Sequence, residues 1–157
     1  MKPRVPPPII ALIAALAMWA LHRWLPLGRW MPWPWQRLGL LPTTVGIAIT
    51  MTAFMSFRQA RTTVNPLQPD RATYLVTEGI FSITRNPMYL GLLLVLVGWA
   101  TWLGSLSTLF VLPLYWVVIT YAQIIPEERA LARLFGEKYA TYRRDVNRWI
   151  GRRAHRQ

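Results

Sequence analysis

The chain has 157 residues, of which 54% are hydrophobic and 15% are charged, and its formal net charge is +12. The apolar content excludes a disordered basic tail, and the low charged fraction argues against an ordinary nucleic-acid-binding domain, which needs polar surface around its basic patch. An all-α membrane protein with basic loops on one side of the bilayer agrees with both numbers.

The first predicted membrane span covers about residues 7–22. The stretch 5–21 holds no charged residue, and the prolines at its start suit the first turn of a helix. Because Lys2 and Arg4 precede an apolar run, a secretory signal peptide is the alternative. Trp19 and Trp24, however, are typical of an interfacial aromatic belt rather than of a cleavage region.

The second predicted span covers about residues 38–57, which are uncharged and long enough to cross a hydrocarbon core of about 30 Å. Its small and hydroxyl residues favour close packing against a neighbouring helix rather than a chemical role; they are Thr44, Gly46, Thr50 and Ser56.

The third and fourth predicted spans form a tight hairpin. Residues 86–126 carry no charge, and as one helix they would run about 60 Å, twice the thickness of the bilayer core. The chain therefore folds back, and the pair Gly104-Ser105 is the natural turn. We expect spans at about 87–103 and 106–125, which makes four in a single domain covering residues 1–157.

Lys and Arg are distributed unevenly between the two sides of this four-span arrangement. The N-terminus, the 58–85 loop and the segment after residue 126 together hold fifteen, and the opposite side holds three. The positive-inside rule then places both termini in the cytoplasm, and we expect an integral protein of a membrane such as a prokaryotic inner membrane.

The segment 127–150 predicts amphipathic helices rather than a disordered basic arm. One helical stripe collects its large apolar residues, namely Leu131, Phe135, Tyr139, Tyr142, Val146 and Trp149. Gly136 can divide the segment into two helices. Two interpretations stay open at this point, a helix lying on anionic lipid and a lid packed over a cytoplasmic site.

The chain has no cysteine. This excludes disulfides, zinc–thiolate sites, iron–sulfur clusters and a cysteine nucleophile. The two histidines, His22 and His155, cannot build a histidine-rich metal site by themselves, so no metal is expected. No nucleotide-binding glycine loop of the soluble type is present.

Two polar clusters lie at the ends of the predicted hairpin, on the same side of the membrane. The first is the segment 85–91, in which Asn86 can cap a helix, Pro87 can start it and Arg85 can anchor it at the interface. The second holds Glu127 and Glu128, which also suit a helix start. At least one of these carboxylates should face the packed side, where it needs a cationic partner such as Arg85.

At these clusters the sequence resembles the integral-membrane methyltransferases, the group of isoprenylcysteine carboxyl methyltransferases and phospholipid N-methyltransferases. Residues 75–91, LVTEGIFSITRNPMYLG, are similar to the pattern L-V-T-x-G-x-Y-x-x-x-R-H-P-x-Y-x-G, and residues 127–146, EERALARLFGEKYATYRRDV, are similar to E-E-x-x-L-x-x-x-F-G-x-x-Y-x-x-Y-x-x-x-V. The resemblance covers about residues 62–150. Phe81 stands where the family usually has Tyr, and Asn86 stands where many members have His.

The resemblance implies S-adenosylmethionine as the methyl donor, held between the last spans and the C-terminal helices. By motif position, the cofactor-binding residues would be Leu75, Val76, Phe81, Asn86, Pro87, Met88, Tyr89, Glu127 and Glu128, with Arg85, Asn86 and Glu127 as the catalytic set. Transfer from an activated sulfonium needs positioning and electrostatics more than a strong base. The acceptor would be a membrane lipid or a small apolar molecule, and no nucleic-acid partner is expected.

Gln123 is the candidate substrate residue. The isoprenylcysteine branch typically has an arginine one helical turn before the acid pair, whereas this chain has glutamine, which cannot form a charged fork with a carboxylate. Gln123 can equally serve only to bridge helices. Two other functions remain open: an NADPH-dependent membrane oxidoreductase similar to steroid reductases, and a membrane scaffold without enzymatic activity. The acceptor atom and the oligomeric state stay open.

Overall fold

The computed structural model describes residues 5–59 and 74–152 of the chain. Their helices are α1 (Pro7–Trp24), η1 (Trp35–Gly39), α2 (Leu40–Gln59), η3 (Gly79–Ser82), α3 (Pro87–Leu103), α4 (Leu106–Leu109), α5 (Val111–Ile119), η4 (Thr120–Ile124) and α6 (Ile125–Asp145). No β-strand is formed within these described ranges, so the predicted all-α class is confirmed. Several residues used in the charge analysis lie outside the described ranges, namely Lys2, Arg4, Arg61, Arg71, Arg153 and Arg156, as do Met1, His155 and Gln157.

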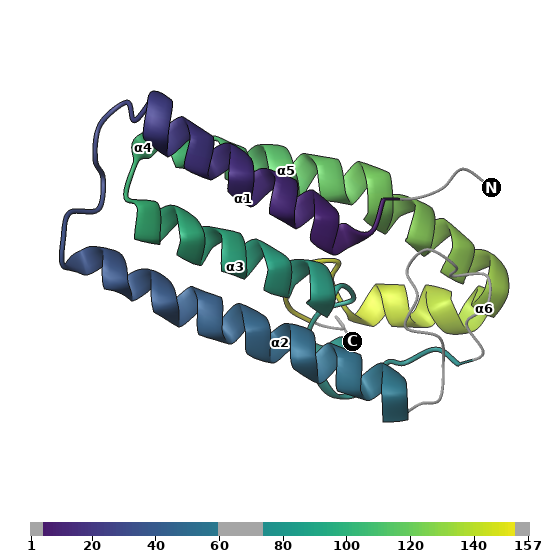
Figure 1. Cartoon of the computed structure of the whole chain (residues 1–157). Helices are drawn as coiled ribbons and strands as arrows, with labels where there is room; N and C mark the ends of the chain where they lie inside the picture. Colours follow the sequence, from purple (N-terminus) through teal and green to yellow (C-terminus); the bar gives the residue numbers. More distant parts are fainter. Residues whose placement is uncertain (1–4, 60–73, 153–157) are drawn as a thin grey trace.

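The four predicted spans are found as helices at the expected places. Three helical stretches are long and apolar enough to cross a membrane, Pro7–Trp24, Trp35–Gln59 and Leu106–Asp145, and Pro87–Leu103 is a shorter apolar helix. Figure 1 shows α3 lying between α1 and α2, with α5 beside α1. The bundle is therefore built around α3.

Glycines bring α2 and α3 into close contact. A Cβ atom on Gly46 would lie 2.5 Å from the Gly91 carbonyl oxygen, and a Cβ on Gly98 would collide with the Gly39 carbonyl oxygen and the Thr43 hydroxyl. Gly39 and Gly46, seven residues apart along η1 and α2, face Gly98 and Gly91 of α3, so a seam of small residues joins the two helices. Backbone-to-backbone packing of this kind replaces the hydrophobic effect, which does not drive helix association in lipid.

Only part of the predicted small-residue set belongs to this seam. Gly46 and Thr50 lie in it, and the Thr50 hydroxyl also donates to the Gly46 carbonyl at 2.8 Å. Thr44 and Ser56 instead donate to carbonyls of their own helix, Leu40 O and Thr52 O, on its exposed side. The expectation for Thr44 was wrong, because this residue is exposed and lies outside the seam; its hydroxyl bonds back to the preceding turn of its own helix.

The hairpin turn is confirmed at Gly104-Ser105. Gly104 has a φ of 68°, the left-handed conformation that glycine adopts without strain, and its N–H donates to Ala100 O. The loop after α1 binds this turn, because Trp30 N donates to Gly104 O at 3.1 Å and Leu106 N donates to Gly28 O at 3.0 Å. The end of the bundle remote from the two polar clusters is therefore closed by backbone hydrogen bonds.

The fourth span continues beyond its predicted end. We expected a new helix to begin at Pro126, yet the helical run passes through it, and η4, a π-helical turn, lies directly before it. Proline lacks the N–H and crowds the carbonyl four residues earlier. In the π turn the backbone hydrogen bonds span five residues instead of four, as from Ile125 N to Thr120 O, and this leaves room for the proline.

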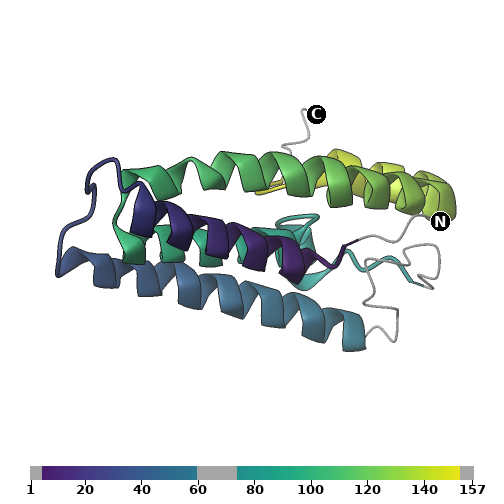
Figure 2. The ribbon, with the colours of Figure 1, turned by 45° about the horizontal axis from the view of Figure 1, so that its top comes forward.

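The chain reverses direction within α6, at Gly136, where φ is 49° and ψ is −123°. Figures 1 and 2 show the part after this break returning toward the ends of α2 and α3. Its apolar stripe packs inward: Tyr139, Tyr142 and Val146 are buried in one cluster with Ala53 and Phe81. This part of the stripe therefore faces protein, as a packed segment requires.

The α2–α3 seam can be tested by enlarging one glycine. Gly46→Leu would force the two backbones apart, so we expect the free energy of unfolding in detergent micelles to fall by about 1–3 kcal/mol or more. Ala48→Leu is the matched control, because Ala48 is exposed on the same helix. Equal stability of the two variants in thermal or denaturant unfolding would contradict the proposed contact.

Candidate functional site

The segment before α3 is fixed by the chain that follows α6. Arg85 N donates to Asn147 O at 3.1 Å and Arg85 Nε donates to Val146 O at 3.0 Å. Gly151 N donates to Ile83 O at 2.8 Å. Residues 146–151, which we term the C-terminal strap, thus hold the first polar cluster in place by main-chain acceptors and donors.

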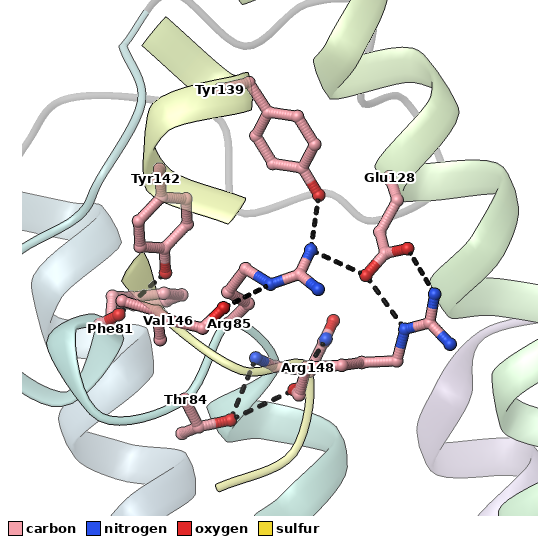
Figure 3. A network of polar contacts seen from close by, with 9 residues as sticks. Phe81, Thr84, Arg85, Glu128, Tyr139, Tyr142, Val146 and Arg148 are labelled. Atoms are coloured by element: carbon pink, nitrogen blue, oxygen red, sulfur yellow. Dashed lines mark hydrogen bonds and ion pairs between the residues drawn. The ribbon is translucent and has the colours of Figure 1, made fainter. Parts of the chain in front are cut away.

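Arg85 and Glu128 form the ion pair that the sequence suggested, with Arg85 Nη1 2.8 Å from Glu128 Oε1 (Figure 3). Both side chains are nearly enclosed, 7% and 11% exposed. Arg148 of the strap binds the same carboxylate from the other side, with Nε donating to Oε1 at 3.0 Å and Nη2 to Oε2 at 2.7 Å. One carboxylate therefore joins α6, the segment before α3 and the strap.

Arg148 was missed by the sequence analysis. It lies beyond the end of α6, where no helical period applies, so its placement could not be derived from the stripe. Its spacing of two residues after Val146 carries no signal of its own. The hydrogen bond with Glu128 raises the pKa of Arg148, so its guanidinium stays charged.

Two buried tyrosines complete the network. Arg85 Nη1 donates to Tyr139 OH at 3.1 Å, and Tyr142 OH donates to Phe81 O at 2.7 Å. Burial, with a smaller contribution from the charge of Glu128, raises the pKa of Tyr139 to about 12, and burial also raises the pKa of Tyr142. Both phenols are therefore neutral at physiological pH and act as hydrogen-bonding groups rather than as bases.

Glu127 has a different partner from its neighbour. Tyr89 OH of α3 donates to Glu127 Oε2 at 2.8 Å, and the Tyr89 side chain is 5% exposed. The two adjacent carboxylates thus point to two separate anchors, Glu128 to the arginines and Glu127 to α3. Two motifs separated by the whole hairpin meet at one end of the bundle.

Asn86 occupies the N-cap position of α3, but its side chain does not cap the helix. Its Nδ2 donates instead to Arg148 O at 3.0 Å, and its N–H donates to the Thr84 hydroxyl at 3.1 Å. Its carbonyl still accepts the first helical bond, from Leu90 N. The capping interpretation is wrong because the strap offers the side chain an acceptor that the helix does not.

The remaining residues predicted for the cofactor lie around Phe81 and the start of α3. Leu75, Val76 and Met88 pack against the cluster that contains Phe81, and Pro87 is buried at the start of α3. Leu75 also lines a cleft of about 600 Å³ between residues 74–82 and the part of α6 after the break. The other lining residues are Tyr74, Thr77, Ser82, Phe135, Lys138, Thr141, Tyr142, Asp145, Val146 and Arg152. A volume of this size lies in the range of small-molecule sites.

Gln123 lies in η4 and is 2% exposed. Its Nε2 donates to Val5 O, just before α1, at 2.7 Å, so it does bridge two helices. Its Oε1, however, is buried and accepts no hydrogen bond from the described residues. A buried acceptor without a donor is costly and is satisfied in many proteins by a ligand or water.

A family model described as phospholipid methyltransferase matches residues 35–138, more than half of the chain. A protein of Haemophilus influenzae described as uncharacterized is 45% identical over 64 residues, which cover 40% of this chain and all of that protein.

Protein-S-isoprenylcysteine O-methyltransferase B of Arabidopsis thaliana is 29% identical over 116 residues, 73% of this chain. The match spans 58% of the plant protein, so this chain corresponds to less than two thirds of its length. No solved structure matches significantly. With its apolar helices and the family match, the chain is an integral membrane protein that belongs to the phospholipid methyltransferase family.

Proposed function

We propose that the protein transfers a methyl group from S-adenosylmethionine to a lipophilic or small apolar acceptor at the cytoplasmic face of the membrane. The observation that carries this proposal is the meeting of the two family motifs through Glu127 and Glu128. The stretch 106–135 runs about 45 Å at 1.5 Å per residue, longer than a hydrocarbon core of about 30 Å. The acid pair therefore lies toward the membrane boundary, where a polar cofactor and a lipid can both arrive.

The charged side chains of the site suit this cofactor. S-adenosylmethionine carries a sulfonium and an ammonium, which carboxylates stabilise, and a carboxylate, which guanidinium groups bind. It supplies an activated methyl group for in-line displacement. Glu128 is bound by two arginines. We assign Glu127 to the cation by its place in the family motif, and the Tyr89 hydroxyl donates to its carboxylate.

In this proposal Arg85 and Asn86 hold other groups of the site in place. Arg85 fixes Glu128 and Tyr139, and Asn86 ties the start of α3 to the strap. Preorganised groups of this kind lower the barrier because they need no rearrangement when charge moves in the transition state. The apolar surface of Leu75, Val76, Phe81 and Met88 would exclude water from the reacting atoms.

Topology is the first prediction of the proposed function. Arg29 and the Gly104-Ser105 turn lie at one end of the bundle, and Arg85 with the acid pair lies at the other. From the charge asymmetry we expect reporters fused to Met1 and Gln157 to read cytoplasmic and a reporter in the 25–36 loop to read external. An external reading for the C-terminal fusion would overturn the cytoplasmic placement of the site.

The second prediction compares two glutamates on α6. Glu127→Gln should weaken S-adenosylmethionine binding by about 30- to 150-fold, since a hydrogen bond to a charged group is worth about 2–3 kcal/mol. Glu137→Gln is the matched control, because Glu137 is exposed. Calorimetry on both purified variants checks the difference, with NADPH as a second ligand. Equal affinities would remove Glu127 from the site, and binding of NADPH alone would favour an oxidoreductase.

The third prediction concerns the acceptor and rests on Gln123. A neutral amide beside the acceptor leaves a buried carboxylate poorly compensated, whereas its unpartnered Oε1 suits a donor group. We therefore expect turnover of an amine lipid headgroup or a small apolar thiol, measured with labelled methyl donor in membranes. Efficient esterification of a farnesyl-cysteine analogue, with no turnover of amines or thiols, would refute this assignment.

A further inference from the structure

Arg148 shares its counter-charge with a second arginine. Its guanidinium and that of Arg85 both bind Glu128. One carboxylate therefore offsets two cations, and the Arg148 charge is only partly compensated. An anion bound beside it would complete the compensation.

The guanidinium of Arg148 also has donors to spare. It presents Nε and Nη2 to Glu128 at 3.0 and 2.7 Å, and Nη1 donates to none of the described residues. A guanidinium carries five N–H donors in one plane, so the edge formed by Nη1 and the second hydrogen of Nη2 remains available. The side chain is 34% exposed, against 7% for Arg85, so a ligand can reach this edge.

The backbone holds Arg148 ready for binding. Its carbonyl accepts from the Thr84 hydroxyl at 3.3 Å and from Asn86 Nδ2 at 3.0 Å (Figure 3). Glu128 fixes the other edge of its side chain. A donor pair that is already oriented loses little entropy when a ligand binds, which favours affinity.

We propose that Arg148 binds the α-carboxylate of the methyl donor through its Nη1/Nη2 edge, while its Nε/Nη2 edge holds Glu128. This inference rests on the proposed function and deepens it, because it assigns the anionic end of the donor to the C-terminal strap. A planar fork matches a carboxylate with two parallel hydrogen bonds. Arg148 then discriminates donors by the presence of that group, a role that Arg85, enclosed in the network, does not have.

The test compares two ligands that differ in one group, S-adenosylhomocysteine and its decarboxylated analogue. Both are titrated calorimetrically into the purified full-length protein and into Arg148→Gln. We expect the unaltered protein to prefer the carboxylate form by about 10- to 150-fold, as for a hydrogen-bonded charge. Arg148→Gln should lose this preference by binding S-adenosylhomocysteine more weakly, with the affinity for the analogue unchanged.

Arg144→Gln is the matched control, because Arg144 is exposed and bonds only to the Thr141 hydroxyl among the described residues, at 3.1 Å. It should keep the full preference. Arg148→Lys retains the charge but not the fork and should lose most of the preference, which keeps the test available if Arg148→Gln does not fold.

The outcomes separate this inference from the function on which it rests. If the unaltered protein binds neither nucleoside, both fail. If it binds both ligands equally, or if Arg148→Gln weakens both to the same extent, the carboxylate assignment alone fails. A retained preference in Arg148→Gln, together with a higher KM for a phospholipid acceptor, would assign the arginine to a lipid phosphate and overturn the assignment to the donor.

Discussion

A nearly enclosed carboxylate at the end of an apolar bundle is the constraint around which this structure is arranged. Two arginines from two other chain segments reach Glu128 there, and removing one partner of such a buried pair costs about 3–5 kcal/mol. The arginines are themselves held, Arg85 by strap carbonyls and the Arg148 carbonyl by the side chains of Thr84 and Asn86. The α6 start, the α3 start and the strap are thus mutually fixed.

This arrangement requires the helical run of α5 to continue through η4 into α6 without a break. Pro126 directly precedes the acid pair, and an α-helical ladder would break there. The π turn at Thr120–Ile124 lets the run continue, and it also turns Gln123 into the bundle. The reversal at Gly136 then returns the apolar stripe to the core, so that Tyr139 OH accepts from the same Arg85 Nη1 that binds Glu128.

Close packing of α2 against α3 holds the apolar part of the bundle together. In lipid, helices associate through packing rather than through burial from water, and the glycines of α2 and α3 permit backbone contact along the seam. α3 is thereby held by α2 on one side and by α1 and α5 on the other, as Figure 1 shows. Because Arg85 and Asn86 lead directly into α3, a rigidly held helix keeps the polar cluster in register with the acid pair.

The sequence by itself determined the features that depend on local pattern. Uncharged length predicted the four helices, Gly104 predicted the turn, Gly136 predicted the break, and the stripe of Tyr139 and Tyr142 predicted a packed face. These follow from residue spacing and backbone freedom, which each segment carries alone.

Only the tertiary structure decided which side chains pair with one another. Arg148 binds Glu128, Tyr89 binds Glu127, Asn86 bonds to the strap and Gln123 bonds to Val5. Such contacts link residues 20 to 118 positions apart, and no local period encodes which donor will reach which acceptor once the helices have packed.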